Sequence, residues 1–354
     1  MECGILKGSL ETDQKRWLAL YEKLPEDRQD VYFLPEYLLP YEKDDRGEAL
    51  CAFAVSGDAV WLYPFLKSSI HGTEHFDILS AYGYAGPLVN GEGEDSSFLK
   101  KAWQGFSDWC LKENVVTEFV RFHPLLENTR WAPSEMQLFV DRQTVPILLH
   151  AYPEAVWNTS YYRVHRQMLR KAERYGYTFH VLEARKSLSW FVPLYNETQD
   201  FLSGSSATRF SSAYFESLTQ GLTNNAWIGA VQYSDKIVAA VLVLEGKRFA
   251  HSHLMGYCRT GITAGMTNLV YHGIALEVAE RKKTCLHMGG GRTKNEDDSL
   301  FAFKKSLSPE RATFSLGTRC HSPTVYEQLG KKWESLHGPR PAGYFQFYRL
   351  RGIY

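Results

Sequence analysis

The residues best suited to chemistry lie close together, between Cys285 and Lys305. The run Cys285–Met288 is apolar and long enough for a buried strand. Glycines follow it directly and leave the backbone unshielded by side chains: Gly289, Gly290 and Gly291. Arg292 comes next, so a cation flanks this stretch of bare backbone N–H groups. The combination suits an anionic group, or an oxygen that becomes negative during a reaction.

An acidic patch after the glycines predicts the start of a helix. Asp298 or Ser299 could cap this helix, which would carry Phe303 and Lys304 about one turn in. If the helix folds back over the strand end, Lys304 would reach the glycines. The alternative interpretation is an ordinary strand-to-helix turn with solvated charges, and these residues alone do not choose between the two.

Composition limits the class of protein. A chain of 354 residues exceeds a typical single domain, so two domains are expected. Its 40 Lys and Arg residues balance 40 Asp and Glu residues, which argues against a DNA partner or a protein that coats nucleic acid. The six cysteines are scattered, as expected for free thiols in a reducing compartment. We recognise no signal peptide and no membrane-spanning run, so a cytoplasmic location is predicted.

Several familiar catalytic motifs are missing. The sequence contains no G-x-S-x-G, no Walker A and no H-E-x-x-H. His251 and His253 alternate on one face of a predicted strand, but two histidines alone are weak evidence for a metal. We therefore expect neither a metal nor a bound cofactor.

The first half of the chain reads as mixed α/β. Its predicted elements are helices at 13–24, 33–41 and 96–113, a hairpin at 50–66, and strands at 76–89, 115–122, 137–140 and 145–149. Aromatic and imidazole side chains in its loops could line a cleft for an acceptor: Tyr82, Tyr84 and His123. Packing in the core is the default interpretation for each of them.

A strongly basic helix is predicted at 160–175. Its arginines recur at three- and four-residue steps and so share one face: Arg163, Arg166, Arg170 and Arg174. The opposite face would carry Val164, Met168 and Ala172. The arginines could hold phosphate groups, although their spacing alone favours a solvated face.

The rest of the second half alternates strands and helices. We predict helices at 190–202, 212–222, 266–282 and 325–336, and strands at 226–233, 237–244, 249–255, 285–288, 311–316 and 344–350. The loop from Arg259 to Gly265 lies between a strand and a helix, where a pyrophosphate could dock on backbone N–H groups. Its spacing departs from a regular glycine-rich loop, so this signal is weak.

Together these segments resemble the FemAB-like branch of the GNAT acyltransferase superfamily. The basic helix is similar to the pattern R-x-x-I-R-K-A-x-x-x-G, and Lys236–Ala240 is similar to the central strand g-x-x-v-A. The glycines with Phe303 and Lys304 resemble the ending G-G-G…F-K. In the first half, 81–87 and 120–125 resemble segments of exopolysaccharide-associated relatives, so the resemblance covers most of the chain.

The resemblance implies an α/β (α+β) fold of two tandem GNAT-like domains with mixed, mostly antiparallel sheets. Residues 1–150 would hold the acceptor cleft, and residues 151–354 the donor channel and catalytic site. It implies an acyl- or aminoacyl-transferase that forms an amide on an amino group of a cell-envelope precursor by direct transfer in a ternary complex. That precursor would be an amino sugar, a lipid-linked saccharide met at the membrane surface, or a peptidoglycan peptide. Acyl-CoA or aminoacyl-tRNA would be the co-substrate.

The resemblance also implies residue roles. The lysine of the F-K motif is thought to help stabilise the transition state, and Lys304 matches it. The donor would be bound by Arg259, Gly265, Gly289, Gly290, Gly291, Arg292 and Phe303. The acceptor and its phosphates would be bound by Tyr82, Tyr84, His123, Arg163, Arg166 and Arg170.

The identity of the donor stays undecided, because this sequence lacks one feature expected for each of the two donors used in the family. The helical arm of peptidoglycan-modifying members is absent, and the pyrophosphate loop is irregular. Two other classes also remain. One is a non-catalytic GNAT-like binding module in polysaccharide or envelope assembly, and the other is an RNA-binding protein that uses the basic helix.

Overall fold

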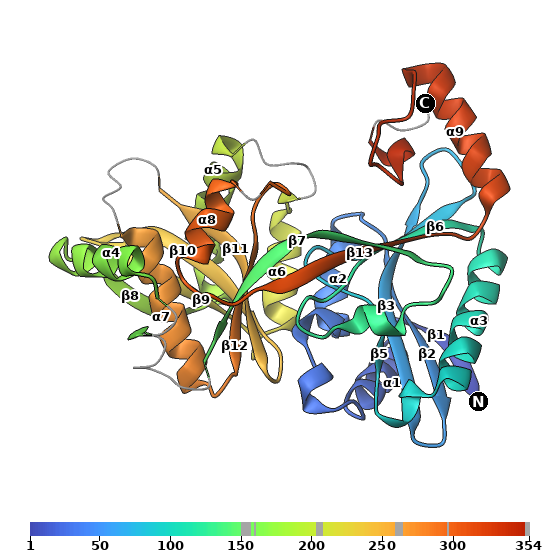
Figure 1. The fold of residues 1–354 in the computed structure, drawn as a ribbon, viewed down its shortest axis with the longest axis horizontal. Coiled ribbons are helices and arrows are strands. Elements are labelled where there is room, and N and C mark those ends of the chain that lie inside the picture. Colours follow the sequence, from blue (N-terminus) through green and yellow to red (C-terminus); the bar gives the residue numbers. More distant parts are fainter. Residues whose placement is uncertain (150–156, 159–160, 203–207, 259–264, 296, 351–354) are drawn as a thin grey trace. The chain divides into compact units, whose positions relative to one another are not determined.

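The structure is a computed structural model, and it describes residues 1–149, 157–158, 161–202, 208–258, 265–295 and 297–350 (Figure 1). Contacts divide the chain into two compact units. Unit 1 comprises 1–28, 32–141 and 314–354, and unit 2 comprises 29–31 and 142–313. The chain therefore changes unit at residues 29–31, and again within two strands, β7 (Gln137–Leu148) and β13 (Ala312–Cys320).

Unit 1 is built on a sheet with the strand order β1-β2-β3-β4-β6-β13, to which β5 adds by pairing with β3. Its pairs are antiparallel except β4 with β6. Besides β13, its strands are β1 (Glu2–Lys7), β2 (Glu48–Ser56), β3 (Ala59–Ser69), β4 (Phe76–Leu79), β5 (Leu88–Val89) and β6 (Val115–Arg121). Its helices are α1 (Glu11–Tyr21), α2 (Pro35–Lys43), α3 (Ser96–Lys112) and α9 (Pro323–His337).

Helix α3 shows how local sequence builds this unit. Asp95 caps the helix, because its carboxylate accepts the N–H of Phe98 at 2.9 Å. From there, residues at three- and four-residue steps turn inward, and Phe98, Ala102 and Phe106 join an aromatic core with the inner face of β2 and β3.

Unit 2 has the strand order β7-β12-β11-β10-β9-β8. Its pairs are antiparallel except β11 with β12. Besides β7, the strands are β8 (Thr178–Glu183), β9 (Ala226–Tyr233), β10 (Lys236–Glu245), β11 (Phe249–Tyr257) and β12 (Cys285–Gly290). The helices are α4 (Arg163–Arg174), α5 (Leu188–Phe201), α6 (Ser212–Gly221), α7 (Met266–Glu280) and α8 (Ser299–Lys305). Apolar residues of α4 and α7 form one core with the sheet: Leu169, Ala172, Val270, Ile274 and Val278.

The predicted fold class is confirmed, because each unit is an α/β body with a mixed, mostly antiparallel sheet. The predicted hairpin and the three-strand meander are present as β2–β3 and β9–β11. The two short strands predicted in 137–149 are one continuous strand, β7. Sequence analysis missed the strands β1 and β8.

The C-terminal segment also differs from the prediction. Residues 314–354 pack in unit 1 rather than with the second half of the chain, since β13 pairs with β6. The strand predicted at 344–350 is wrong: Phe347–Arg349 is a turn of 3-10 helix whose aromatic rings are buried. Its alternating aromatic residues mimic a strand but serve a local core with α9.

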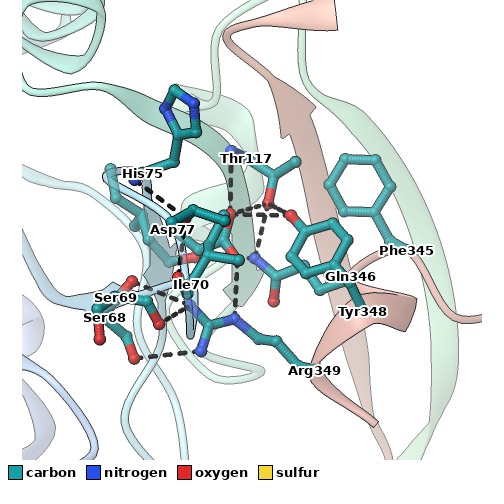
Figure 2. A network of polar contacts seen from close by, with 12 residues as sticks. Ser68, Ser69, Ile70, His75, Asp77, Thr117, Phe345, Gln346, Tyr348 and Arg349 are labelled. Carbon is teal, nitrogen blue, oxygen red and sulfur yellow. Dashed lines mark hydrogen bonds and ion pairs between the residues drawn. The ribbon is translucent and has the colours of Figure 1, made fainter. Parts of the chain in front are cut away.

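A buried carboxylate holds this segment in place (Figure 2). Asp77 is fully buried on β4 and accepts hydrogen bonds from Thr117 Oγ1 at 2.7 Å and from the Tyr348 hydroxyl at 3.0 Å. Arg349 Nε donates to the same carboxylate at 2.7 Å, and its Nη2 donates to the Ser68 carbonyl at 2.9 Å. Burial raises the pKa of Asp77, and the neighbouring guanidinium opposes that rise. The C-terminal segment is thus tied to β3, β4 and β6 by polar contacts.

Candidate functional site

The candidate site lies where two parallel strands of unit 2 stop pairing. β11 and β12 pair with each other only through Phe249–His251 and Cys285–His287. Beyond that point β12 runs on to Gly290 and β11 to Tyr257, which still pairs with β10 on its other side. The facing edges therefore carry backbone groups that the neighbouring strand does not pair. An extended donor with amide groups could bind between such edges.

The end of β12 needs its glycines for space and conformation. Gly289 has a φ of 72°, in the left-handed region. A Cβ on Gly290 would lie 2.9 Å from the carbonyl oxygen of Gln143, and one on Gly291 would lie 2.6 Å from Asp298 Oδ1. No larger residue fits either position unless its neighbours move. The glycine turn, defined as Gly289–Gly291, is therefore tightly enclosed.

Asp298 caps α8 and also fixes the glycine turn, which decides between the two predicted capping residues. Its Oδ1 accepts the N–H of Phe301 at 3.0 Å. Its Oδ2 accepts the backbone N–H groups of Arg292 at 3.1 Å and Thr293 at 3.0 Å. Partial burial pushes the pKa of Asp298 upward, but these hydrogen bonds outweigh it and hold the pKa below its usual value. The carboxylate is thus a fixed anion at the helix start.

Lys304 folds back onto the glycine turn. Its side chain is buried, and Nζ donates a hydrogen bond to the carbonyl oxygen of Gly290 at 2.8 Å. Burial lowers the pKa of Lys304 from 10.5 to about 8, against the opposite influence of the Asp298 carboxylate. The neighbouring side chains differ: Phe303 packs against Tyr271, and Lys305 Nζ lies 4.9 Å from the ring centroid of Phe301. The interpretation of this stretch as a turn with only solvated charges is wrong for Lys304.

A second cation holds the glycine turn, and sequence analysis missed it. Arg142 Nη1 donates to the carbonyl oxygen of Gly291 at 2.9 Å. The antiparallel register places Thr144 opposite Gly290, which brings Arg142 beside the turn from β7. No local pattern could have shown this, because 149 positions separate the two residues.

The loop predicted to bind a pyrophosphate is described only at its end. Arg259 lies outside the described residues. Gly265 precedes α7 with a φ of 106°, and a Cβ there would collide with the carbonyl oxygen of Met168 on α4. The glycine is thus explained by the close approach of α4 to α7. Its contact with a donor stays a prediction.

The arginines of α4 do not behave alike. Arg163 and Arg170 are exposed, as is Arg292 at the glycine turn. Arg166 is half-buried and donates to two backbone carbonyls, that of Trp157 at 3.1 Å and that of Tyr161. Its guanidinium therefore supports the chain before α4. The phosphate-binding role of all three predicted arginines stays a prediction.

The buried face of α4 agrees with the prediction at Ala172 only. It consists of His165, Leu169 and Ala172, while Val164 is exposed. The sequence pattern did not indicate the rest of this face, because the buried His165 stands among basic residues.

This histidine belongs to a polar cluster that sequence analysis did not find. His165 Nδ1 accepts a hydrogen bond from Asn268 Nδ2, in the first turn of α7, at 2.7 Å. Tyr161 lies edge-on to His165 and makes a hydrogen bond of 3.1 Å with His272. Burial lowers the pKa of His165 to about 3 and that of His272 to about 4, so both imidazoles are neutral at physiological pH. They can give hydrogen bonds but no positive charge.

Three of the residues predicted to bind the acceptor, Tyr82, Tyr84 and His123, belong to unit 1. Tyr84 and His123 have ring centroids 5.4 Å apart, and both side chains are buried. Tyr82 is half-buried, with the Arg121 guanidinium 6.0 Å from its ring centroid. The structure therefore brings Tyr84 and His123 together, and among the three Tyr82 has the largest exposed fraction. Their contact with an acceptor stays a prediction.

In the described part of the chain, no helix is long and apolar enough to cross a lipid bilayer.

Comparisons with known proteins agree with this fold. The family described as "Acetyltransferase (GNAT) domain" matches residues 159–305, which contain α4, the glycine turn and Lys304. The crystal structure of FemX is similar with a TM-score of 0.70 at 12% identity, over 93% of this chain and 99% of that one. L-PGS from Bacillus licheniformis is similar with a TM-score of 0.54 at 15% identity, over 86% and 90%. A tandem GNAT protein from the clavulanic acid biosynthesis pathway gives 0.50 at 11% identity, over 91% and 100%. No curated protein matches the sequence significantly.

Proposed function

We propose that the chain is an acyltransferase or aminoacyl-transferase. The resemblance to the FemAB-like branch of the GNAT superfamily, the fold similar to that of FemX and the GNAT match over residues 159–305 support this proposal. The chain forms an amide on an amino group of a cell-envelope precursor: an amino sugar, a lipid-linked saccharide or a peptidoglycan peptide. The donor is acyl-CoA or aminoacyl-tRNA. The amine attacks the donor carbonyl directly, in a complex that holds both substrates.

The observation that carries the proposal is the position of Lys304. Nζ of a charged lysine has three N–H donors, and the Gly290 carbonyl occupies one of them. Two remain for the oxygen of the tetrahedral intermediate, which becomes negative when the amine adds to the carbonyl carbon. With a pKa of about 8, Lys304 is mostly charged at neutral pH. Burial strengthens its field, because little water screens it.

The surrounding groups would hold this cation in place before the donor arrives. Asp298 and Arg142 fix the glycine turn from the N–H side and the carbonyl side. A preorganised cation needs no rearrangement when charge develops, and this is the main source of such catalysis. Collapse of the intermediate then breaks the C–S bond to CoA or the C–O bond to the ribose of tRNA. The proton lost by the attacking amine ends on the departing sulfur or oxygen, and the amide remains.

The donor would lie between β11 and β12, with its carbonyl at the end of β12. The exposed side chains of Arg292, Arg163 and Arg170 would contact its phosphates. The predicted pyrophosphate loop, Arg259–Gly265, would add backbone N–H groups. These contacts would suit either donor, because both carry phosphate groups: in aminoacyl-tRNA next to the terminal nucleoside, and in acyl-CoA at the far end of the pantetheine arm.

Mass spectrometry of candidate acceptors tests the function. Wild-type protein is incubated with each acceptor and acyl-CoA in one series, and with charged tRNA in another. A mass gain equal to one acyl or aminoacyl group, lost with Lys304→Met and kept with Lys305→Met, supports the proposal and selects the donor. An acceptor that binds but gains no mass with either donor would instead identify a binding module.

A further inference from the structure

A cavity in unit 1 is separate from the glycine turn. It has a volume of about 460 Å³ and lies between the inner face of β1, β2 and β3 and helix α3. Pockets of roughly 300–1,000 Å³ are typical of sites for small molecules. This one is formed entirely by residues of unit 1, so its shape does not depend on unit 2.

The walls of the cavity combine apolar and charged side chains. Ile5 and Leu50 line one side, and Phe106 and Trp109 line the other. Trp61 also contributes, and its buried indole N–H has no hydrogen-bond partner among the described residues.

The charged groups of the cavity gather in one network of alternating sign. Lys7 Nζ lies 3.2 Å from Glu48, whose other oxygen lies 3.8 Å from Lys67 Nζ. Lys67 in turn lies 2.9 Å from Glu113. The two ends of the network are its most accessible members, with exposed side-chain fractions of 54% for Lys7 and 36% for Glu113. A cation and an anion are therefore both available to a ligand.

A glycine inside α3 keeps the cavity open. Gly105 lies in the middle of the helix, where glycine costs about 1 kcal/mol relative to alanine. Its φ is negative, and a Cβ would meet only ordinary contacts with Cys3, at 3.7 Å and 3.8 Å. Neither conformation nor crowding therefore requires a glycine. Its effect is to leave space that a larger side chain would fill.

We propose that this cavity binds an amino acid with an apolar side chain. The side chain enters the apolar part, while the α-carboxylate pairs with Lys7 and the α-ammonium with Glu113. The site is independent of the proposed transfer reaction, which takes place at the glycine turn.

Calorimetric titration with L-phenylalanine tests the binding. We expect saturable binding to the wild type and a loss of at least tenfold in affinity with Gly105→Leu, which fills the cavity. The matched variant Gly105→Ala should keep most of the affinity. Phenylalanine methyl ester lacks the carboxylate and N-acetylphenylalanine lacks the ammonium, so each should bind at least tenfold more weakly. Equal affinity for Gly105→Leu and wild type, or no binding to wild type, would overturn the proposal.

Alkylation of Cys3 gives a second readout that needs no variant. Cys3 is an exposed thiol that lines the cavity, whereas Cys258 and Cys320 are half-buried elsewhere. Saturating L-phenylalanine should slow the reaction of iodoacetamide with Cys3 at least severalfold, as measured by peptide mass spectrometry. The other two thiols should react at unchanged rates. Unchanged alkylation of Cys3, or equal slowing of all three, would contradict binding in this cavity.

Discussion

Replacing Lys304 by methionine should stabilise the protein at neutral pH while it removes activity. The folded state lowers the pKa of Lys304 from 10.5 to about 8. This shift means that folding with the side chain charged is about 3 kcal/mol less favourable than folding with it neutral. Methionine keeps most of the length of the side chain but loses the hydrogen bond to Gly290, worth about 1 kcal/mol. The variant should therefore be more stable by about 2 kcal/mol at pH 7.

The sign of this effect depends on pH in a defined way. Below pH 8 the lysine is charged in both the folded and the unfolded state, so the folded state carries the full cost of burial. Between pH 8 and pH 10.5 the folded lysine loses its proton first, and the stability of the wild type rises. At pH 10 the difference between the two proteins should be near zero, and above pH 10.5 the wild type should be the more stable.

Urea unfolding of both proteins at pH 7 and pH 10 measures this difference. Lys305→Met is the matched control, because that lysine only lies over the Phe301 ring and should contribute at most about 1 kcal/mol. In the transfer assay, Lys304→Met should lower kcat by two to three powers of ten, roughly the effect of losing one oxyanion donor. A Lys304→Met variant that is less stable than wild type at pH 7 would refute the argument that burial of the charge is costly. Full activity would remove Lys304 from the mechanism.

Three further predictions concern other contacts. Gly265→Ala should lower the free energy of unfolding in urea by about 2–4 kcal/mol, because the alanine must adopt a left-handed conformation and its Cβ clashes with α4. The control Gly91→Ala lies in open space and should change stability by less than about 0.5 kcal/mol. Equal effects of the two substitutions would contradict the close approach of α4 to α7. Arg349→Met should cost about 3 kcal/mol because it leaves the buried Asp77 carboxylate unpaired, and adding Asp77→Asn should restore much of the loss in a double-mutant cycle. Arg170→Ala should weaken donor binding about tenfold, as measured by calorimetry. Unchanged affinity in a folded variant would show that the arginine face of α4 contacts only solvent.

The local parts of the candidate site could be predicted from the sequence. A strand, a glycine turn, a capping aspartate and a helix follow one another within 21 residues, and the geometry of each depends mainly on its neighbours in the chain. The fold-back of Lys304 to Gly290 follows, because the two residues are only 14 positions apart. The same reasoning placed the three-strand meander, whose turns are short and polar.

The remaining features depend on contacts between distant segments. Arg142 reaches the glycine turn only because β7 pairs with β12, and a register shift would move it away. His165 and Leu169 join Ala172 on the buried face of α4 because α7 packs there, although the arginine spacing placed Val164 and Met168 on that face. The aromatic C-terminal segment has the alternation of a strand, yet Asp77 and the local core with α9 hold it as a turn. Periodicity records which positions are apolar, whereas only the tertiary structure decides which partner each position meets.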